Sequence, residues 1–330
     1  MPHPGPRNLL TDIPGLLVGH AIDERVDTGV TVIRTERPWT ASVDIRGGGP
    51  GGRESAALEP ENMVGQLHAL VFSGGSVFGL GAADAVTAAL SVQGVGLHLK
   101  AGAPAIPIVP AAVLHDLSND GDKDWGLEPP YRRLGFEALN NCAEDFDLGA
   151  AGAGRGAMAG VLQGGLGSAS LDLGDGLVVA ALVVANPIGS VYMPDGQSFW
   201  AWPWEIAGEA GGARPQGEQD CNDPMPDLSR LDSMGRLQAG ANTTLVVVAS
   251  TAQMSTADCK RAATIRPSPK SSEAEPKPPC STPAIAPRPA PTRNTRYTRH
   301  RRHRRSIQHL IRRHREPRRH PPLHQIRDLI

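Results

Sequence analysis

The sequence predicts an α/β protein whose strands and helices pack in layers. Along the first 264 residues, short runs of β-branched and aliphatic residues alternate with Ala-rich or amphipathic stretches. Gly, Pro, Asn and Asp separate these runs, as they do between strands and helices. A stretch of this length can bury a sizeable hydrophobic core.

Hydrophobic periodicity and flanking turn residues indicate where each helix and strand lies. We expect helices where Ala-rich or amphipathic periodicity extends over ten residues or more, and strands where short apolar runs are bounded by breakers. We expect an irregular extended stretch over 106–117 and an exposed loop over 207–236, because the latter is rich in Gly, Pro and Asp. Thr256 is the expected N-cap of the last helix. The expected strands are 16–18, 28–33, 42–45, 67–72, 177–185 and 244–249, and the expected helices are 77–90, 130–142 and 256–263.

The formal net charge of −1 conceals two segments of opposite charge. Residues 266–330 hold 17 Lys and Arg against 4 Asp and Glu, whereas residues 1–265 hold 16 against 30. The basic segment has 12 of the 30 prolines and no Gly, Val, Phe or Trp. Such a composition cannot offset its ordering entropy by burial. We therefore divide the chain into a body, residues 1–264, and a disordered Pro/Arg/His-rich tail, residues 265–330.

Composition also bears on location and partners. The four cysteines show no CxxC spacing, which indicates free thiols in a reducing compartment. The N-terminal residues lack the blocks of a signal peptide, and no apolar run reaches the ~18 residues of a membrane span, so we expect a cytoplasmic protein. The histidines lack metal-ligand spacing, and we expect neither metal nor cofactor. The tail could attract phosphates, but its one aromatic, Tyr297, disfavours a nucleic-acid partner.

One glycine-rich stretch imitates a nucleotide-binding motif. Residues 152–157, GAGRGA, fit the loose pattern G-x-G-x-x-A. The preceding residues 145–148 make a poor strand, and no acidic residue about 20 positions on ends a second strand. A tight turn or close packing is the favoured interpretation.

The most informative motif is Asn242-Thr243-Thr244 directly before the apolar run 245–249. A cut before Thr243 would leave a threonine whose free α-amino group can serve as the base for its own hydroxyl. Two other interpretations stay open. Asn and Thr commonly begin strands, and the same three residues form a glycosylation sequon.

Five motifs in order resemble one hydrolase family. They are LTDIPGLLVGH at 10–20, VDIRGGGPG at 43–51, HALVFSGGS at 68–76, GGLGSAS at 164–170 and GANTT at 240–244. Together they resemble the DmpA-type L-aminopeptidase/D-amino-acid esterases, whose relatives include the nylon-oligomer hydrolase NylC and the β-peptidyl aminopeptidases. The resemblance runs over residues 8–263.

The resemblance implies a four-layer αββα sandwich similar to that of N-terminal-nucleophile hydrolases. It implies self-cleavage between Asn242 and Thr243 into an α chain, 1–242, and a β chain, and assembly of these protomers into a homo-oligomer. Thr243 matches the nucleophile and Asn186 the residue that donates to the oxyanion. The implied activity is hydrolysis of short peptides, amino-acid amides or esters through an acyl-enzyme on Thr243.

The chain departs from the family pattern in three places. Val161 stands where the family usually carries a lysine, and His115, a candidate substrate contact, stands where relatives often have an aromatic residue. After the helix expected at 256–263 there is no Asp-Gly-Asp-Thr or Ser-x-Glu segment. We hypothesise that a change of reading frame replaced it with the present tail, which translation of the gene in its other two frames would test. The alternative function is an unprocessed, inactive homologue that lacks these acidic residues.

Overall fold

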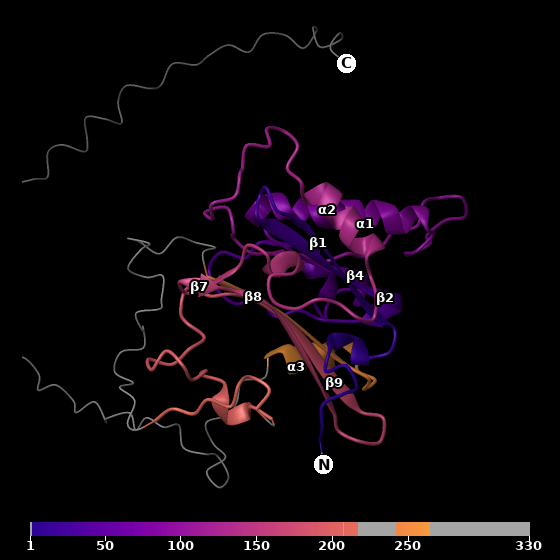
Figure 1. Cartoon of the computed structure of the whole chain (residues 1–330). Helices are drawn as coiled ribbons and strands as arrows, with labels where there is room; N and C mark the ends of the chain where they lie inside the picture. Colours follow the sequence, from indigo (N-terminus) through magenta and orange to yellow (C-terminus); the bar gives the residue numbers. More distant parts are fainter. Residues whose placement is uncertain (1, 207, 217–241, 265–330) are drawn as a thin grey trace, which may run out of the picture. The chain divides into compact units, whose positions relative to one another are not determined.

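A computed structural model of the chain describes residues 2–206, 208–216 and 242–264 (Figure 1). The expected tail at 265–330, most of the expected loop at 207–236, Cys221 and Cys280 lie outside these residues. The described part of that loop, 208–216, contains no helix or strand. Within the described residues, no helix combines the length and apolar character needed to cross a membrane.

The first sheet has five strands in the order β1-β2-β4-β5-β3. β2 pairs antiparallel to both β1 and β4, β5 pairs parallel to β4, and β3 pairs antiparallel to β5. The strands expected at 28–33 and 67–72 form its centre. The strands are β1 (Leu16–Asp23), β2 (Thr28–Thr40), β3 (Gly52–Arg53), β4 (Gln66–Ser73) and β5 (Ala111–Val113).

Two helices, α1 (Gly81–Val92) and α2 (Tyr131–Asn140), cover one face of this sheet (Figure 1). Alternate residues of the strands point toward the helices, because side chains in a strand alternate between faces. Burial of these side chains in a common core holds the helices on the sheet. The core includes Val30, Val32, Ala69, Val71, Ala83, Val86, Leu90, Ala111, Leu134 and Ala138.

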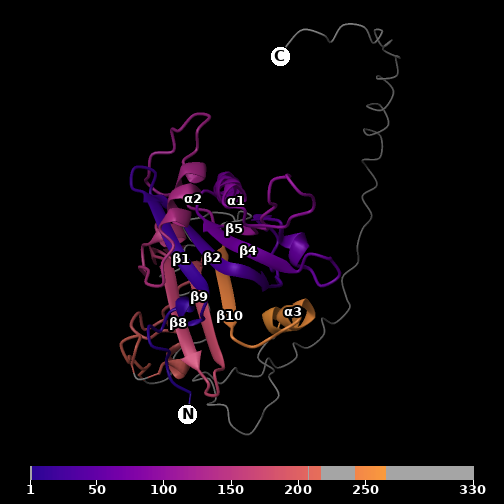
Figure 2. The same ribbon diagram turned by 90° about the vertical axis from the view of Figure 1, so that its right-hand side faces the viewer.

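A second, antiparallel sheet packs against the other face. It contains β8 (Gly165–Asp172), β9 (Val178–Asn186) and β10 (Thr243–Ser250) in the order β10-β9-β8. Figure 2 shows the two sheets stacked below α1 and α2. The described residues therefore form three layers, helices, sheet and sheet. The core between the sheets includes Leu16, Val18, Ile33, Phe72, Leu114, Leu166, Leu182, Val184 and Leu245.

Figure 2 shows the helix α3 (Thr256–Thr264) beside β10. Lys260 Nζ forms an ion pair with Glu59 at 2.9 Å and donates to the carbonyl oxygen of Val43 at 2.6 Å. On the outer face of the second sheet, Val246 and Val248 remain 52% and 65% exposed. Of the four layers implied by the family resemblance, the described residues supply three.

Smaller elements connect these layers. A two-stranded hairpin, β6-β7, precedes β8 and brings its turn next to the end of β9. Its strands are Met158–Ala159 and Leu162–Gln163, and 3₁₀ turns lie at Leu10–Asp12, Ser55–Leu58, Ser76–Leu80, Gly152–Gly154 and Trp202–Trp204.

Three expectations about local structure were wrong. Residues 42–45 are not a strand but an irregular segment, in which the Ser42 hydroxyl donates to the carbonyl of Leu58. The first helix begins at 81 rather than 77, because residues 76–80 form a 3₁₀ turn. The last helix is capped by Ser255, not Thr256: the Ser255 hydroxyl accepts from the Asp258 N–H at 3.2 Å, and the Asp258 carboxylate accepts from the Ser255 N–H.

The glycine-rich stretch at 152–157 is a tight turn, which confirms the favoured interpretation. Gly152 has φ of +49°, and a side chain there would collide with Thr31 and His20. The Ala153 N–H donates to the Thr31 hydroxyl at 3.0 Å. The turn packs on β2 and no helix follows it, so the stretch lacks the helix N-terminus that binds a pyrophosphate.

His68 makes the stability of this fold depend on pH. It is 2% exposed, and its Nδ1 accepts from the Ile108 N–H at 3.1 Å. Burial lowers the pKa of His68 below its ordinary 6.5. The unfolded chain therefore takes up a proton near pH 6.5 that the native chain does not, and stability falls as the pH drops through that value.

Because asparagine can accept the same hydrogen bond without titrating, His68→Asn is the matched variant. We expect the free energy of unfolding of the wild type to fall relative to the variant between pH 7 and pH 5, by up to ~1.4 kcal/mol per pH unit. Urea unfolding at several pH values measures this difference. A difference that stays constant across the range would contradict the prediction.

Candidate active site

The pairing of β10 with β9 brings the two principal candidate residues together. Thr243, the first residue of β10, lies directly opposite Asn186, the last residue of β9. Directly opposed residues in an antiparallel pair put their side chains on the same face, with Cβ atoms about 4.5–5.5 Å apart. Two residues further along, Leu245 and Val184 are opposed on the same face and are buried between the sheets. Thr243 and Asn186 therefore share the inner face.

Asn186 is fully buried and held at both ends of its amide. Its Oδ1 accepts from the Met158 N–H at 2.9 Å, and its Nδ2 donates to the carbonyl oxygen of His115 at 3.2 Å. Met158 begins the β6-β7 hairpin, and His115 follows β5. Two separate segments thus fix the direction of the amide, which is the preorganisation that a donor to a developing oxyanion requires.

The residue before Thr243 is also held. The Asn242 Oδ1 accepts from the Ile188 N–H at 3.1 Å, where the chain leaves β9. Asn242 itself is exposed. The peptide bond between Asn242 and Thr243 therefore lies at the tip of the second sheet, anchored on both sides.

The structure locates both departures from the family pattern that fall within the described residues. Val161 occupies the turn between β6 and β7 and is 47% exposed. The preceding Gly160 N–H donates to the carbonyl of Pro187 at 3.1 Å, so this turn lies beside the residue after Asn186. The His115 ring contacts the Ser118 hydroxyl at 2.8 Å, while its main-chain carbonyl contacts Asn186. Residue 115 thus contacts Asn186 through its main-chain carbonyl and not through its side chain.

Sequence reasoning missed Asp116, which lies next to His115 and is only 3% exposed. The Gly75 N–H donates to its Oδ1 at 2.6 Å, and the Thr28 hydroxyl donates to its Oδ2 at 2.6 Å. Burial raises the pKa of Asp116, and these hydrogen bonds act in the opposite direction. The available signal was a carboxylate inside the apolar run AAVLHDL, since a buried carboxylate requires partners.

The described cysteines are poor nucleophiles. Burial raises the pKa of Cys142 to about 12, and burial together with the Asp258 carboxylate raises the pKa of Cys259. A thiol acts as a nucleophile in its thiolate form, which neither residue adopts at neutral pH. Across residues 2–206, 208–216 and 242–264, no three His, Cys, Asp or Glu side chains are grouped to hold a metal ion.

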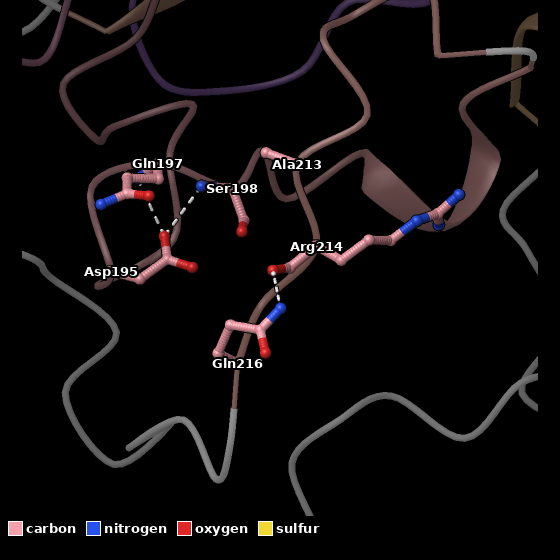
Figure 3. A pocket seen from close by; sticks show the side chains of 6 residues that line it. All are labelled: Asp195, Gln197, Ser198, Ala213, Arg214 and Gln216. Atoms are coloured by element: carbon pink, nitrogen blue, oxygen red, sulfur yellow. Dashed lines mark hydrogen bonds between the residues drawn. The ribbon is translucent and has the colours of Figure 1, made fainter.

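A cavity of about 360 Å³ lies apart from these residues (Figure 3). The Asp195 carboxylate on its wall accepts from the main-chain N–H groups of Gln197 and Ser198. The Arg214 guanidinium extends away from Asp195, donates to the carbonyl of Trp202 and lies 5.0 Å from that residue's ring centre. Neither Thr243 nor Asn186 lines this cavity, so its chemistry is separate from theirs. It is lined by Asp195, Gln197, Ser198, Ala213, Arg214 and Gln216.

Comparison with known proteins places the chain in a family. An uncharacterized aminopeptidase of Mycobacterium tuberculosis is 36% identical over 267 residues, covering 78% of this chain and 73% of that protein. A 6-aminohexanoate-oligomer endohydrolase of Kocuria is 32% identical over 194 residues, covering 57% of this chain and 50% of that protein. A Burkholderia β-aminopeptidase structure shares the fold, with a TM-score of 0.55 and 23% identity over 79% of this chain and 66% of its own.

The family model of peptidase family S58 matches residues 8–267. The match ends close to residue 265, where the composition of the chain changes. It includes β9, β10 and the loop that carries His115 and Asp116. The chain belongs to peptidase family S58.

Proposed function

We propose that this chain is a self-processing aminopeptidase or amidase that acts on short peptides, amino-acid amides or esters through an acyl-enzyme on Thr243. The observation that carries the proposal is the register of β10 with β9, in which Thr243 opposes the doubly anchored Asn186 on the inner face. The family's peptidase character and the aminopeptidase names of its relatives support it.

Self-processing would begin with the hydroxyl of the intact Thr243. Its Oγ1 attacks the carbonyl carbon of Asn242, the C–N bond breaks, and the hydroxyl proton passes to the departing amine. Water then hydrolyses the resulting ester and releases the Asn242 carboxylate. The hydrogen bond from Ile188 to the Asn242 side chain holds this peptide bond against the end of β9.

Hydrolysis of a substrate would use the same groups after the cut. The new α-amino group takes the proton of Oγ1, which attacks the substrate carbonyl, and an N–H of Asn186 donates to the oxygen that becomes negative. The C–N or C–O bond of the substrate then breaks, and the α-ammonium group gives its proton to the departing amine or alcohol. The amide group of Asn186 that donates to the His115 carbonyl is thus also the proposed donor to the oxyanion. Water releases the acyl group, and the processed protomers associate as a homo-oligomer.

A second candidate is an unprocessed homologue without catalytic activity. One observation that favours it is the uncharged Val161 at the turn beside Pro187. The other is that the family match ends at residue 267 without an Asp-Gly-Asp-Thr or Ser-x-Glu segment after the last helix. This candidate predicts a single uncut chain.

The intact mass of the purified protein, with N-terminal sequencing of any small fragment, distinguishes the two. Self-processing predicts an 88-residue fragment, 243–330, that begins Thr-Thr-Leu-Val-Val. Turnover of a panel of aminoacyl p-nitroanilides then tests hydrolysis. An uncut chain without turnover would reject the proposed activity in favour of the inactive homologue.

A further inference from the structure

Asp116 is the point at which several segments near the candidate site meet. Its carboxylate receives the Gly75 N–H, from the turn after β4, and the Thr28 hydroxyl, from the start of β2. Gly74 and Gly156 leave the space it needs, since a Cβ at either position would lie 2.0 or 2.7 Å from Oδ2. The side chain is thus enclosed by three loops and accepts hydrogen bonds from two of them.

The same residue is linked to Asn186 through its own peptide bond. The carbonyl of His115 belongs to the planar unit that ends at the Asp116 nitrogen and α-carbon. That carbonyl accepts from Asn186 Nδ2 at 3.2 Å. Anchoring the Asp116 side chain therefore restricts the position of the oxygen that orients the Asn186 amide.

We propose that Asp116 is a positioning residue, which holds the His115 carbonyl and thereby aims the Asn186 amide at the reacting carbonyl. The effect of Asp116 on turnover rests on the proposed function. The link from the Asp116 side chain through the His115 carbonyl to Asn186 does not depend on that function. Misplacement of a catalytic group by about 1 Å can cost about 10²-fold in rate. A carboxylate that never touches substrate can therefore determine turnover.

Other charged and titratable groups also lie around Asp116. Lys123 Nζ is occupied by the carbonyl of Val26 and the side chain of Asn119, and Arg155 is paired with Asp27 at 2.8 Å. The Tyr131 ring packs against Gly75, where a Cβ would lie 2.0 Å from its Cζ. Burial raises the pKa of Tyr131, and the Asp116 carboxylate adds to this shift. The His115 ring contacts Ser118, and Asp23 is paired with Arg133. None of these contacts joins the His115 carbonyl to the Gly75 turn.

The test compares variants that remove the anchor with variants that preserve it. Asp116→Ala leaves the Gly75 N–H and the Thr28 hydroxyl unpartnered, and we expect kcat to fall about 30- to 100-fold with KM within about threefold. Asp116→Asn can accept from Gly75 and donate to Thr28, so we expect it to keep kcat within about threefold. Thr28→Val removes the bond to Oδ2 and keeps the Gly75 bond to Oδ1, so it should give an intermediate loss.

Asp12→Ala is the matched control. Its carboxylate also accepts from one hydroxyl, of Ser170, and from main-chain N–H groups, of Arg7 and Leu9. Ser170 lies opposite Ala180 on β9, six residues or about 20 Å along the strand from Asn186. We expect Asp12→Ala to lower stability and to leave kcat unchanged.

The side-chain amide signal of Asn186, in protein labelled with ¹⁵N-asparagine, reports the link without reference to activity. We expect Asp116→Ala and Thr28→Val to move this signal, and Asp12→Ala to leave it in place. An unmoved signal together with wild-type kcat in a folded Asp116→Ala protein would overturn the proposal. If Asp116→Ala does not fold, Thr28→Val decides by the same two readouts. If the wild type shows neither turnover nor self-cleavage but the variants still move the Asn186 signal, the link is supported and only the proposed function is rejected.

Discussion

Replacing Thr243 by valine is expected to leave one uncut chain and to lower hydrolysis by more than about 10⁴-fold, because the attacking hydroxyl is lost. Valine has nearly the shape of threonine and favours strands, so the pairing of β10 with β9 should persist. Intact mass measures the cut, and steady-state turnover measures hydrolysis. No other substitution considered is expected to have an effect as large.

Two variants control for changes in the strand itself. Thr243→Ser keeps a hydroxyl and should still be cut, with turnover reduced far less. Thr244→Val makes the same change one residue later, on the opposite, exposed face of β10, where the residue opposes Ala185. It should leave cutting and turnover unchanged. Normal cutting of Thr243→Val would mean that another residue is the nucleophile.

The second large effect is expected at Asn186. Alanine there removes the oxyanion donor, and kcat should fall by about 10²- to 10³-fold, equivalent to about 3–4 kcal/mol of barrier. It also removes the hydrogen bonds that Asn186 makes with the Met158 N–H and the His115 carbonyl, so we expect a loss of about 1–3 kcal/mol in stability. Kinetics and urea unfolding on the same preparations measure both effects.

Asn186→Asp separates the two contributions. Aspartate still accepts from the Met158 N–H, but it cannot donate to the oxyanion and adds a negative charge beside it. Its kcat should therefore be at least as low as that of the alanine variant. If both variants fold and keep kcat within threefold of the wild type, Asn186 does not bind the oxyanion.

The strands that sequence patterns predicted are those whose own residues form a clear apolar pattern. β9 and β10 are continuous apolar runs bounded by Asn, and their positions agree with expectation within one or two residues. β5 was expected only as part of an irregular stretch, because it has three residues and follows Pro107 and Pro110. It is a strand because the edge of β4 is available to it, which is a property of the tertiary structure.

The candidate site, too, was predictable only in part from the sequence. Thr243 was predicted from a motif and Asn186 from the family resemblance. Their direct opposition depends on the register between two strands, in which the two residues are 57 positions apart. The role of the His115 carbonyl was not predictable from its side chain, because any residue supplies a carbonyl at that position. Asp116 carried a signal, a carboxylate in an apolar run, but its partners Thr28 and Gly75 lie far away in the sequence.

The eight-residue ladder between β9 and β10 has a consequence for refolding. In an uncut chain this ladder closes by an intramolecular search, whose rate does not depend on protein concentration. A cut before Thr243 would turn the same hydrogen bonds into an interface between two polypeptides, and recovery from denaturant would become second order. The processed protein would then be durable mainly through slow unfolding, and dilution alone would prevent its recovery once the two pieces had separated.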